Sequence, residues 1–409
     1  MSGSDGPPVP KRRASRADTN SQPEDSKHAR RDPEMRPPLA RFSIHPLSKY
    51  RLACPAFKEP REILSFSYDE QRQMRMDNHQ LKYFYPPRVD DAPSLFDGFE
   101  QQICRDSTKN EHIDGLLNAL AFERQRARAA LDEKKKKNMD ADFVMYRGML
   151  TRIFVTPFSL RDEWSMNIAR VGRTIYIEDN VTSEKIAERA GSSEQHQKMM
   201  FSGYKFEALS MIDAPPESLS QEQLAAKLGQ RSSEVVNTHS EYCTVFRTQL
   251  GPHSIISGAE VDCIDRAKPG ELPNRHYREL KTSRCLDTEK ARNSFARFKL
   301  LKFWAQSFIA GIPVVTVGFR DDEGRLREVR DIRTQDMPRM VRDKPRMWEA
   351  NVCMNFANQV LQFIKDQALE EGPEAQYRIE YNPETSEIQL RSLGNRPSFL
   401  TDEYMKSLE

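Results

Sequence analysis

Long apolar runs are missing from this 409-residue sequence: a membrane-spanning helix needs roughly 18 consecutive apolar residues, and none occur. The start MSGSDGPPVPKRRASR contains no apolar stretch that could serve as a secretion signal. The six cysteines form no CxxC pair, and the eight histidines stand at no ligand spacing from a cysteine, so no zinc site is expected. We interpret the cysteines as reduced core thiols of an intracellular protein.

An excess of charge of one sign is also missing, since 63 lysines and arginines face 61 aspartates and glutamates, a net charge of +2. This balance excludes a protein that is basic over its whole surface and wraps nucleic acid, but it leaves room for a local basic groove. Hydrophobic residues make up 37% of the chain, enough for one large core or two modest ones.

Residues 1–40 contain almost no large apolar side chains and are rich in Ser, Pro, Asp, Lys and Arg. Such a segment cannot bury enough apolar surface to offset its ordering entropy, so we predict a disordered basic tail. Its basic clusters, Lys11–Arg13 with Arg16 and then Arg30–Arg31, could form a nuclear-import signal or only a solvated tail. We predict that residues 41–409 form the globular domain, with its chemical core between residues 142 and 325.

Hydrophobic patterning predicts an α+β fold: a single large domain with mixed, mostly antiparallel sheets flanked by helices. Helices are expected where apolar residues recur at helical spacing, over Glu111–Lys136, Asp287–Ala310 (with Asp287 as N-cap) and Trp348–Leu369. Strands are expected where β-branched and aromatic residues alternate with polar ones, over Phe42–Leu52, Leu64–Tyr68, Phe143–Phe154, Trp164–Arg170, Thr174–Glu178, Met199–Leu209, Tyr242–Leu250, Ser254–Ile264, Tyr277–Thr282, Val314–Phe319, Gln376–Tyr381 and Glu387–Leu390.

Acidic residues on three of these predicted strands are the candidate metal-binding groups. Residues two apart on a strand share a face, so Glu260 is expected beside Asp262, and Glu279 beside Lys281, while Glu207 shares a face with Gly203. Either pair alone is more often an ordinary exposed strand position with cross-strand ion pairs. Here three such elements follow one another, apolar residues alternate with the acids in each, and a helix comes after the last. This combination favours a divalent metal site.

Basic and amide side chains are expected near these acids. The order Asp262, Glu279, Lys281 and then a helix resembles the PD-(D/E)xK nuclease superfamily, in which carboxylates hold Mg²⁺ or Mn²⁺ and the lysine lies beside the attacked phosphorus. On that helix Phe295, Lys299, Lys302 and Gln306 form one stripe, and Phe298, Leu301, Ala305 and Phe308 a separate apolar one. Gln306 could contact a phosphate or simply face solvent. The Arg147 guanidinium could bind phosphate, and Gly148 would allow a close backbone approach.

Together these motifs resemble the DXO family of RNA 5′-end decapping nucleases, and the fungal-type nuclear members in particular. The motifs that carry the resemblance are Tyr146–Thr151, Gly203–Glu207, Glu260–Asp262, Glu279–Lys281, Lys299–Gln306 and Gly318–Arg320 with Gly324.

The resemblance implies a role for each matching residue. Glu207, Glu260, Asp262 and Glu279 would hold divalent metal, with the backbone carbonyl of Leu280 as a further ligand. Lys281 and Gln306 would contact the scissile phosphate. Tyr146, Arg147 and Gly148 would grip the RNA 5′ end, and Glu260 would also face substrate. Cys243 would line the substrate pocket, although by itself it is better explained as a buried structural thiol.

The resemblance also implies substrates and partners. The expected substrates are RNA 5′ ends that carry a triphosphate, an NAD cap or an incompletely methylated guanosine cap, cleaved by water attack at the RNA-side phosphorus. The expected partner is a nuclear 5′→3′ exoribonuclease acting in RNA quality control and rRNA processing, so the expected location is the nucleus. Two alternatives remain open: a PD-(D/E)xK nuclease acting on DNA, and a non-catalytic stabilising subunit of the exoribonuclease.

Overall fold

The computed structural model describes residues 37–106, 108–266, 271–367 and 369–409. The basic tail predicted for residues 1–40 lies almost entirely outside them. No helix in these ranges is both long enough and apolar enough to cross a membrane. The described cysteines are all free, but Cys54 and Cys104 are exposed, so the prediction of core thiols is wrong for these two.

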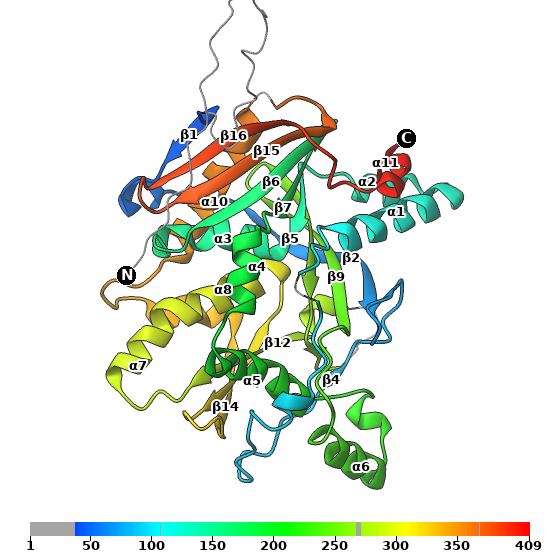
Figure 1. Ribbon diagram of the computed structural model, residues 1–409, viewed down its shortest axis with the longest axis vertical. Coiled ribbons are helices and arrows are strands. Elements are labelled where there is room, and N and C mark those ends of the chain that lie inside the picture. The colour runs from blue at the N-terminus through cyan, green and yellow to red at the C-terminus, as the bar shows by residue number, and fades with distance from the viewer. Residues whose placement is uncertain (1–36, 107, 267–270, 368) are drawn as a thin grey trace, which may run out of the picture.

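Two sheets form the framework, and helices pack against them (Figure 1). Most strand pairs are antiparallel, which confirms the predicted α+β class with mixed sheets. The ten-stranded sheet contains, in spatial order, β1 (Ala40–Ser43), β16 (Glu387–Asn395), β15 (Gly372–Asn382), β6 (Trp164–Val171), β7 (Thr174–Asp179), β5 (Phe143–Tyr146), β10 (His253–Glu260), β9 (Glu241–Leu250), β2 (Phe57–Tyr68) and β3 (Met74–Arg75). The six-stranded sheet contains β14 (Leu326–Arg333), β13 (Val314–Arg320), β12 (Tyr277–Arg284), β11 (Cys263–Ile264), β4 (Tyr83–Phe84) and β8 (Met211–Ile212).

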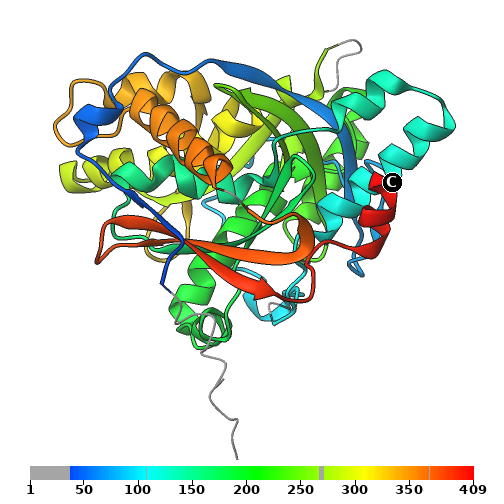
Figure 2. The same ribbon diagram turned by 90° about the horizontal axis from the view of Figure 1, so that it is seen from above.

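Helices pack against these sheets. Their bounds are α1 Asp114–Ala129, α2 Glu133–Asn138, α3 Arg147–Val155, α4 Ser183–Ala190, α5 Glu194–Ser210, α6 Gln221–Arg231, α7 Glu289–Ser294, α8 Leu300–Ala310, α9 Met337–Val341, α10 Ala350–Asp366 and α11 Asp402–Leu408. Seen from above, α10 lies alongside β1 and the β15–β16 hairpin (Figure 2), where the Phe42 and Phe356 ring centroids are 5.8 Å apart. The largest apolar cluster includes Trp304 of α8, which stacks on Trp348 with a centroid separation of 5.1 Å.

The prediction of a strand over Met199–Leu209 is wrong, because these residues belong to helix α5. The Ser193 hydroxyl caps its first turn by accepting a hydrogen bond from the His196 N–H. Phe201, Phe206 and Leu209 are buried on one side of the helix, a helical rather than a strand periodicity.

The predicted strand Phe143–Phe154 is also wrong beyond Tyr146. Helix α3 begins at Arg147, so the Tyr146-Arg147-Gly148 motif marks a junction between strand and helix. Leu150, Ile153 and Phe154 are buried at helical spacing, which explains why the chain coils here.

Three smaller boundaries differ from prediction. The strand that begins near Phe42 ends at Ser43, and a short 3₁₀ turn over Leu47–Tyr50 follows Pro46. The helix expected over Glu111–Lys136 breaks between α1 and α2, where Leu131 has a positive φ of 53°. The helix expected from Asp287 is capped by Thr288 instead, whose hydroxyl accepts from the Ala291 N–H.

One turn of π-helix, Phe295–Lys299, joins α7 to α8. A π turn holds one residue more than an α turn, so it rotates the residues before it relative to those after it. As a result Phe295 is buried, whereas Phe298, predicted to lie on the apolar stripe, is 48% exposed.

Two glycines near the acidic motifs provide a test of this fold. A Cβ at Gly318 on β13 would lie 2.5 Å from the Phe206 ring of α5, whereas a Cβ at Gly203 would meet no atom within 4 Å. We expect Gly318→Ala to lower the free energy of unfolding by about 1–3 kcal/mol, the usual cost of overpacking. Gly203→Ala should raise it by about 0.5–1 kcal/mol, because Gly203 lies inside a helix. Chemical denaturation measures both, and destabilisation by Gly203→Ala would contradict the helical assignment.

Candidate active site

The two sheets are joined where β10 ends at Glu260 and β11 begins at Cys263. Asp262 was predicted to lie on one continuous strand with Glu260. It lies instead in the link between the two sheets. The Val261 N–H donates to the Tyr242 carbonyl at 2.9 Å, which holds the link to β9. The Asp262 carboxylate accepts from the Leu280 N–H at 2.5 Å, which holds it to β12. These bonds bring acids from both sheets together.

On β12, Glu279 and Lys281 share a face as predicted. The Lys281 Nζ lies 2.7 Å from the Glu279 Oε1 and 3.9 Å from the Asp262 Oδ2. Arg147, the first residue of α3, places its Nη1 2.9 Å from the Glu279 Oε2. Glu279 is only 2% exposed, so two cations neutralise a buried carboxylate. The Leu280 carbonyl, expected to be a metal ligand, accepts a hydrogen bond from the Lys281 Nζ at 3.1 Å.

Glu207 comes from the last turns of α5, and its side chain lies within electrostatic range of Glu260 and Asp262. Burial raises the pKa of all three carboxyls, and the neighbouring acids raise it further. The pKa of Glu260 reaches about 8, with burial as the largest cause and then Glu241 and Asp262. The pKa of Asp262 reaches about 6, because Lys281 partly offsets its burial.

Glu279 behaves in the opposite way. Burial alone would raise its pKa, but Arg147 and Lys281 outweigh burial and lower the pKa well below its usual range. Glu279 is therefore fully paired with two cations. Glu207, Glu260 and Asp262 have no such pairing and share only the attraction of the Lys281 ammonium.

The buried carboxylates are candidates for binding a divalent metal ion. Across the described residues, no three Asp, Glu, His or Cys side chains are set at the geometry of a metal site. In this arrangement Arg147 and Lys281 occupy both oxygens of Glu279. The donor set still fits a hard divalent cation, since Glu207, Glu260 and Asp262 offer carboxylate oxygens whose mutual repulsion a cation would relieve.

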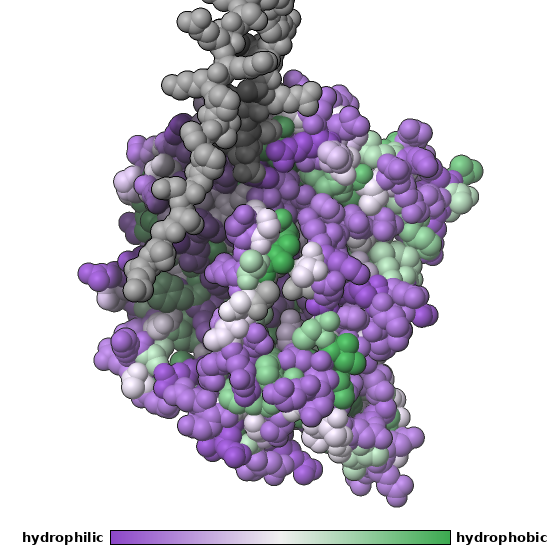
Figure 3. Space-filling model, viewed as in Figure 1, coloured by the Kyte–Doolittle hydropathy of each residue, from purple (hydrophilic) through white to green (hydrophobic). Residues whose placement is uncertain are grey.

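A cavity of about 1390 Å³ opens beside these three acids. Its lining includes Glu207, Glu260 and Asp262, together with Tyr204 and Arg105. Glu279, Lys281 and Gln306 are not part of its lining among the described residues, so the cavity stops at the carboxylates. The face of the molecule seen in Figure 3 is mostly hydrophilic, with scattered apolar patches.

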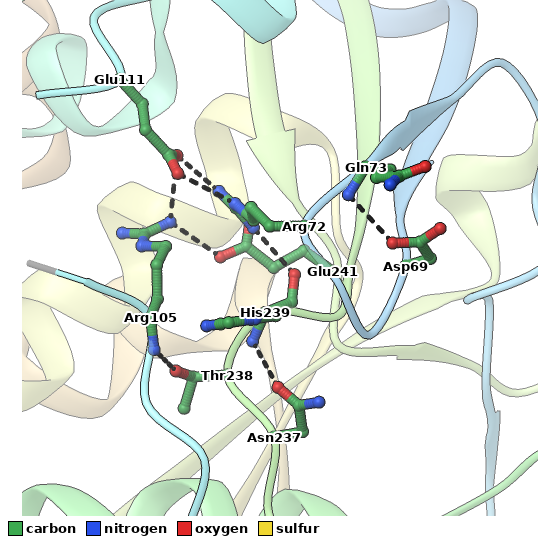
Figure 4. Close-up of polar contacts among 9 residues, drawn as sticks. All are labelled: Asp69, Arg72, Gln73, Arg105, Glu111, Asn237, Thr238, His239 and Glu241. Carbon is green, nitrogen blue, oxygen red and sulfur yellow. Dashed lines mark hydrogen bonds and ion pairs between the residues drawn. The ribbon is translucent and has the colours of Figure 1, made fainter. Parts of the chain in front are cut away.

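Sequence reasoning missed a charged network at the side of this cavity (Figure 4). Arg72 contacts Glu241 at 2.6 Å and Glu111 at 2.7 Å, and Arg105 contacts Glu241 at 3.1 Å. These pairs fix Glu241, which raises the pKa of Glu260. The alternation of β9 could have revealed Glu241, because it lies two residues before Cys243; Arg72 and Arg105 lie in loops without periodicity.

The remaining predicted residues lie around the same centre. Cys243 is 4% exposed, and its backbone lies opposite that of Glu260 where β9 runs antiparallel to β10. Tyr146 packs over Gly258, where a Cβ would lie 2.7 Å from its ring. Gly148 is exposed, and Gln306 is half-buried on α8. Cys243 and Tyr146 therefore adjoin β10, and Gly148 directly follows Arg147, while the roles of all four residues toward substrate remain predictions.

Comparison with known proteins gives the family. The sequence family described as "RAI1 like PD-(D/E)XK nuclease" matches residues 58–405. The chain is 34% identical to the decapping nuclease RAI1 of Neurospora crassa over 377 residues, which covers 90% of this chain and 86% of that protein. It is also 34% identical to the decapping and exoribonuclease protein of Xenopus laevis over 374 residues, covering 87% and 90%.

Solved structures agree with this result. S. pombe Rai1 is 28% identical to this chain, with a TM-score of 0.65 over 86% of this chain and 99% of that one. Candida albicans Rai1, at 23% identity, shares the fold with a TM-score of 0.77 over 90% of this chain and 98% of that one. Because the family match spans most of the sequence and curated relatives exceed 30% identity over most of their length, the chain belongs to the RAI1/DXO family of decapping nucleases, with a PD-(D/E)XK nuclease fold.

Proposed function

We propose that this decapping nuclease hydrolyses modified 5′ ends of RNA in a metal-dependent reaction. Water attacks the RNA-side phosphorus and releases the 5′ group intact, from RNA that carries a triphosphate, an NAD cap or an incompletely methylated guanosine cap. The observation that carries the proposal is that Glu207, Glu260 and Asp262 line one cavity and that the Lys281 Nζ lies 3.9 Å from the Asp262 carboxylate.

Related structures support the choice of substrate and metal. S. pombe Rai1, at 28% identity, was solved in complex with 3′-FADP. Scheffersomyces stipitis Rai1 was solved with (3′-NADP)⁺ and a calcium ion, and C. albicans Rai1 with pU5 and Mn²⁺. These ligands combine a nucleotide, several phosphates and a divalent cation, which matches a roomy cavity with an acidic floor.

In the proposed mechanism Glu207, Glu260 and Asp262 would hold Mg²⁺ or Mn²⁺. Glu279 and the Leu280 carbonyl would become further ligands once the Lys281 ammonium, which contacts both, turns to the phosphate. When bound, the cation would polarise the phosphate and lower the pKa of a water molecule. Lys281 places its ammonium beside the phosphorus and neutralises charge that develops there. Arg147 keeps Glu279 ionised, and Gln306 donates to a phosphate oxygen.

The cavity accounts for the range of proposed 5′ groups. Its volume of about 1390 Å³ exceeds the roughly 300–1,000 Å³ typical of a small-molecule site. Nicotinamide, guanosine or bare phosphates would therefore fit without base-specific contacts. We propose that Tyr146, Gly148 and Cys243 border the substrate on the side of β5 and β9.

We further propose that the protein acts in the nucleus, where it binds and stimulates a 5′→3′ exoribonuclease in RNA quality control and rRNA processing. The relatives' names support decapping over a DNA nuclease, and the intact carboxylates support a catalytic role over a purely stabilising one. The basic segment Lys11–Arg16 supports nuclear import.

Neutral replacements of the acids test the catalytic proposal. We expect Glu260→Gln and Asp262→Asn each to lower kcat for cap release by about 10²-fold or more, because each removes charge that binds the cation. Incubation with 5′-triphosphate, NAD-capped and GpppN-capped RNAs in Mg²⁺ or Mn²⁺, followed by identification of the released fragments, measures the loss. Glu328→Gln on the exposed face of β14 is the matched control and should remain active. Full turnover by both acidic-site variants would refute the assignment.

Lys281 provides a second test. If its ammonium stabilises the transition state, Lys281→Ala should lower kcat by about 10²-fold and leave KM nearly unchanged. Arg147 would still pair with Glu279 in this variant, so the fold should persist, as circular dichroism would verify. A change confined to KM would assign Lys281 to substrate binding instead.

The raised pKa of Glu260 predicts a pH dependence of stability. Between pH 4.5 and about 8 the folded, metal-free protein holds a proton on Glu260 that the unfolded chain releases, so this group lowers stability as pH rises. Glu260→Gln removes the effect, so its thermal midpoint should exceed that of the wild type by a margin that widens from pH 5 to pH 8. Added Mn²⁺ should stabilise the wild type more at pH 8 than at pH 6. A margin independent of pH would contradict the raised pKa.

A further inference from the structure

A second cavity, of about 490 Å³, lies between β2, α1 and the start of β12. Its volume is typical of a binding site for a small molecule. Among the described residues its lining and that of the larger cavity have only Tyr242 in common, so it is a separate site. Apolar side chains form part of its wall, namely Ile63, Leu64, Leu81, Phe122 and Ile264.

One carboxylate in the lining of this second cavity, that of Glu62, has no cation beside it. The Thr244 and Tyr277 hydroxyls both donate to the Glu62 Oε2, each at 2.6 Å. In the part of the chain that the structure describes, no basic nitrogen lies within 4 Å of Glu62, and its Oε1 has no hydrogen-bond partner. Burial raises the pKa of Glu62, and only the two hydroxyls oppose this effect. A positive group at the Oε1 would stabilise the ionised carboxylate.

The basic side chains of the same lining are paired with a different acid. The Arg126 Nη1 lies 3.6 Å and the Lys135 Nζ 3.5 Å from the Glu123 carboxylate. Because Asp77 also lines the cavity, three acids face two basic side chains, and the lining has an excess of one negative charge. This excess disfavours phosphate groups and RNA and favours a cation. The apolar wall favours a cation that carries a hydrocarbon chain over a bare metal ion.

Hydrogen bonds connect Glu62 to both sheets close to the active site. Tyr277, which donates to Glu62, lies on β12 two residues before Glu279 and therefore on the same face. The Tyr277 hydroxyl is 2.9 Å from the Tyr242 hydroxyl of β9. The Tyr242 carbonyl in turn accepts from the Val261 N–H, in the link that carries the acids of the active site. A ligand at Glu62 would act on the point where the two sheets meet.

We propose that the second cavity binds a primary aliphatic amine, whose ammonium group pairs with the Oε1 of Glu62. The alkyl chain covers Ile63, Leu64 and Phe122. The ammonium keeps Glu62 ionised, and an ionised acceptor strengthens the hydrogen bond from Tyr277. The bound amine therefore holds the start of β12 more firmly and acts as an effector of the active site. Its effect on catalysis rests on the proposed function, whereas its binding does not.

Calorimetry tests the binding site without reference to catalysis. The full-length protein is titrated with hexan-1-amine and, separately, with hexan-1-ol, which has the same chain length but no charge. We expect Glu62→Gln to weaken binding of the amine by about 10-fold or more, the usual effect of losing one hydrogen bond to a charged group. Glu59→Gln is the matched control, because Glu59 lies on the same strand, pairs with Arg275 and does not line the cavity.

Two results would overturn the binding site. They are equal affinity of the wild type and Glu62→Gln for the amine, and equal affinity of the wild type for the amine and the alcohol. A lysine side chain carries the same ammonium group, so Nα-acetyl-lysine methylamide is titrated as well. Tighter binding of hexan-1-amine supports a free amine as the ligand, and tighter binding of the lysine derivative would overturn it in favour of a protein ligand.

Kinetics test the effector role. Saturating hexan-1-amine should raise kcat/KM for pyrophosphate release from 5′-triphosphate RNA by about 5-fold, the lower end of typical coupling between two sites. Glu62→Gln should show no such increase, and Glu59→Gln should respond as the wild type does. An unchanged or lower kcat/KM in the wild type would overturn the effector role. If the wild type releases no 5′ group but still binds the amine through Glu62, the proposed function fails and the binding site stands.

Discussion

The Asp262 carboxylate holds the site together by accepting a hydrogen bond from the Leu280 N–H. Asp262 belongs to the short link that leaves the ten-stranded sheet, and Leu280 lies in the middle of a strand of the six-stranded sheet. This bond therefore fixes the separation of the two sheets at the point where each contributes its acids. The Arg147–Glu279 ion pair and the hydrogen bond between the Tyr242 and Tyr277 hydroxyls join the two sheets at the same place.

Charge balance follows from this arrangement. Glu279 is buried with two cations, so it stays ionised and contributes little net field. Glu207, Glu260 and Asp262 lie close together without cations paired to them in this way, and burial and mutual repulsion therefore raise their pKa values. Natural proteins maintain unfavourable charge of this kind mainly at functional sites.

Strands with regular alternation were predictable from the sequence. β6, β7, β9 and β13 lie within one residue or so of their predicted bounds, and the shared face of Glu279 and Lys281 is confirmed by their contact. Helix α5 was missed because Tyr204 and Phe206 alternate with polar residues over a short window, while the helical spacing of Phe201, Phe206 and Leu209 shows only over a longer one. The sequence alone could not reveal the π turn, because packing of Phe295 against Phe319 selects it. It could not reveal the Arg72–Glu241 pair either, since the two residues are far apart in the chain.

The sheet edges limit how copies of this chain can associate. Among the described strands, the ten-stranded sheet ends in β1 with four residues and β3 with two, and one edge of the other sheet is the two-residue β8. Two longer edges remain, β14 and the part of β2 before Ser67, which β3 does not pair with. Their exposed positions carry charged residues: Arg327, Glu328, Arg330, Asp331 and Arg333 on β14, and Lys58, Glu59 and Arg61 on β2. A second chain that added a strand there would have to desolvate these charges, so the fold resists edge-to-edge aggregation by both shortness and charge.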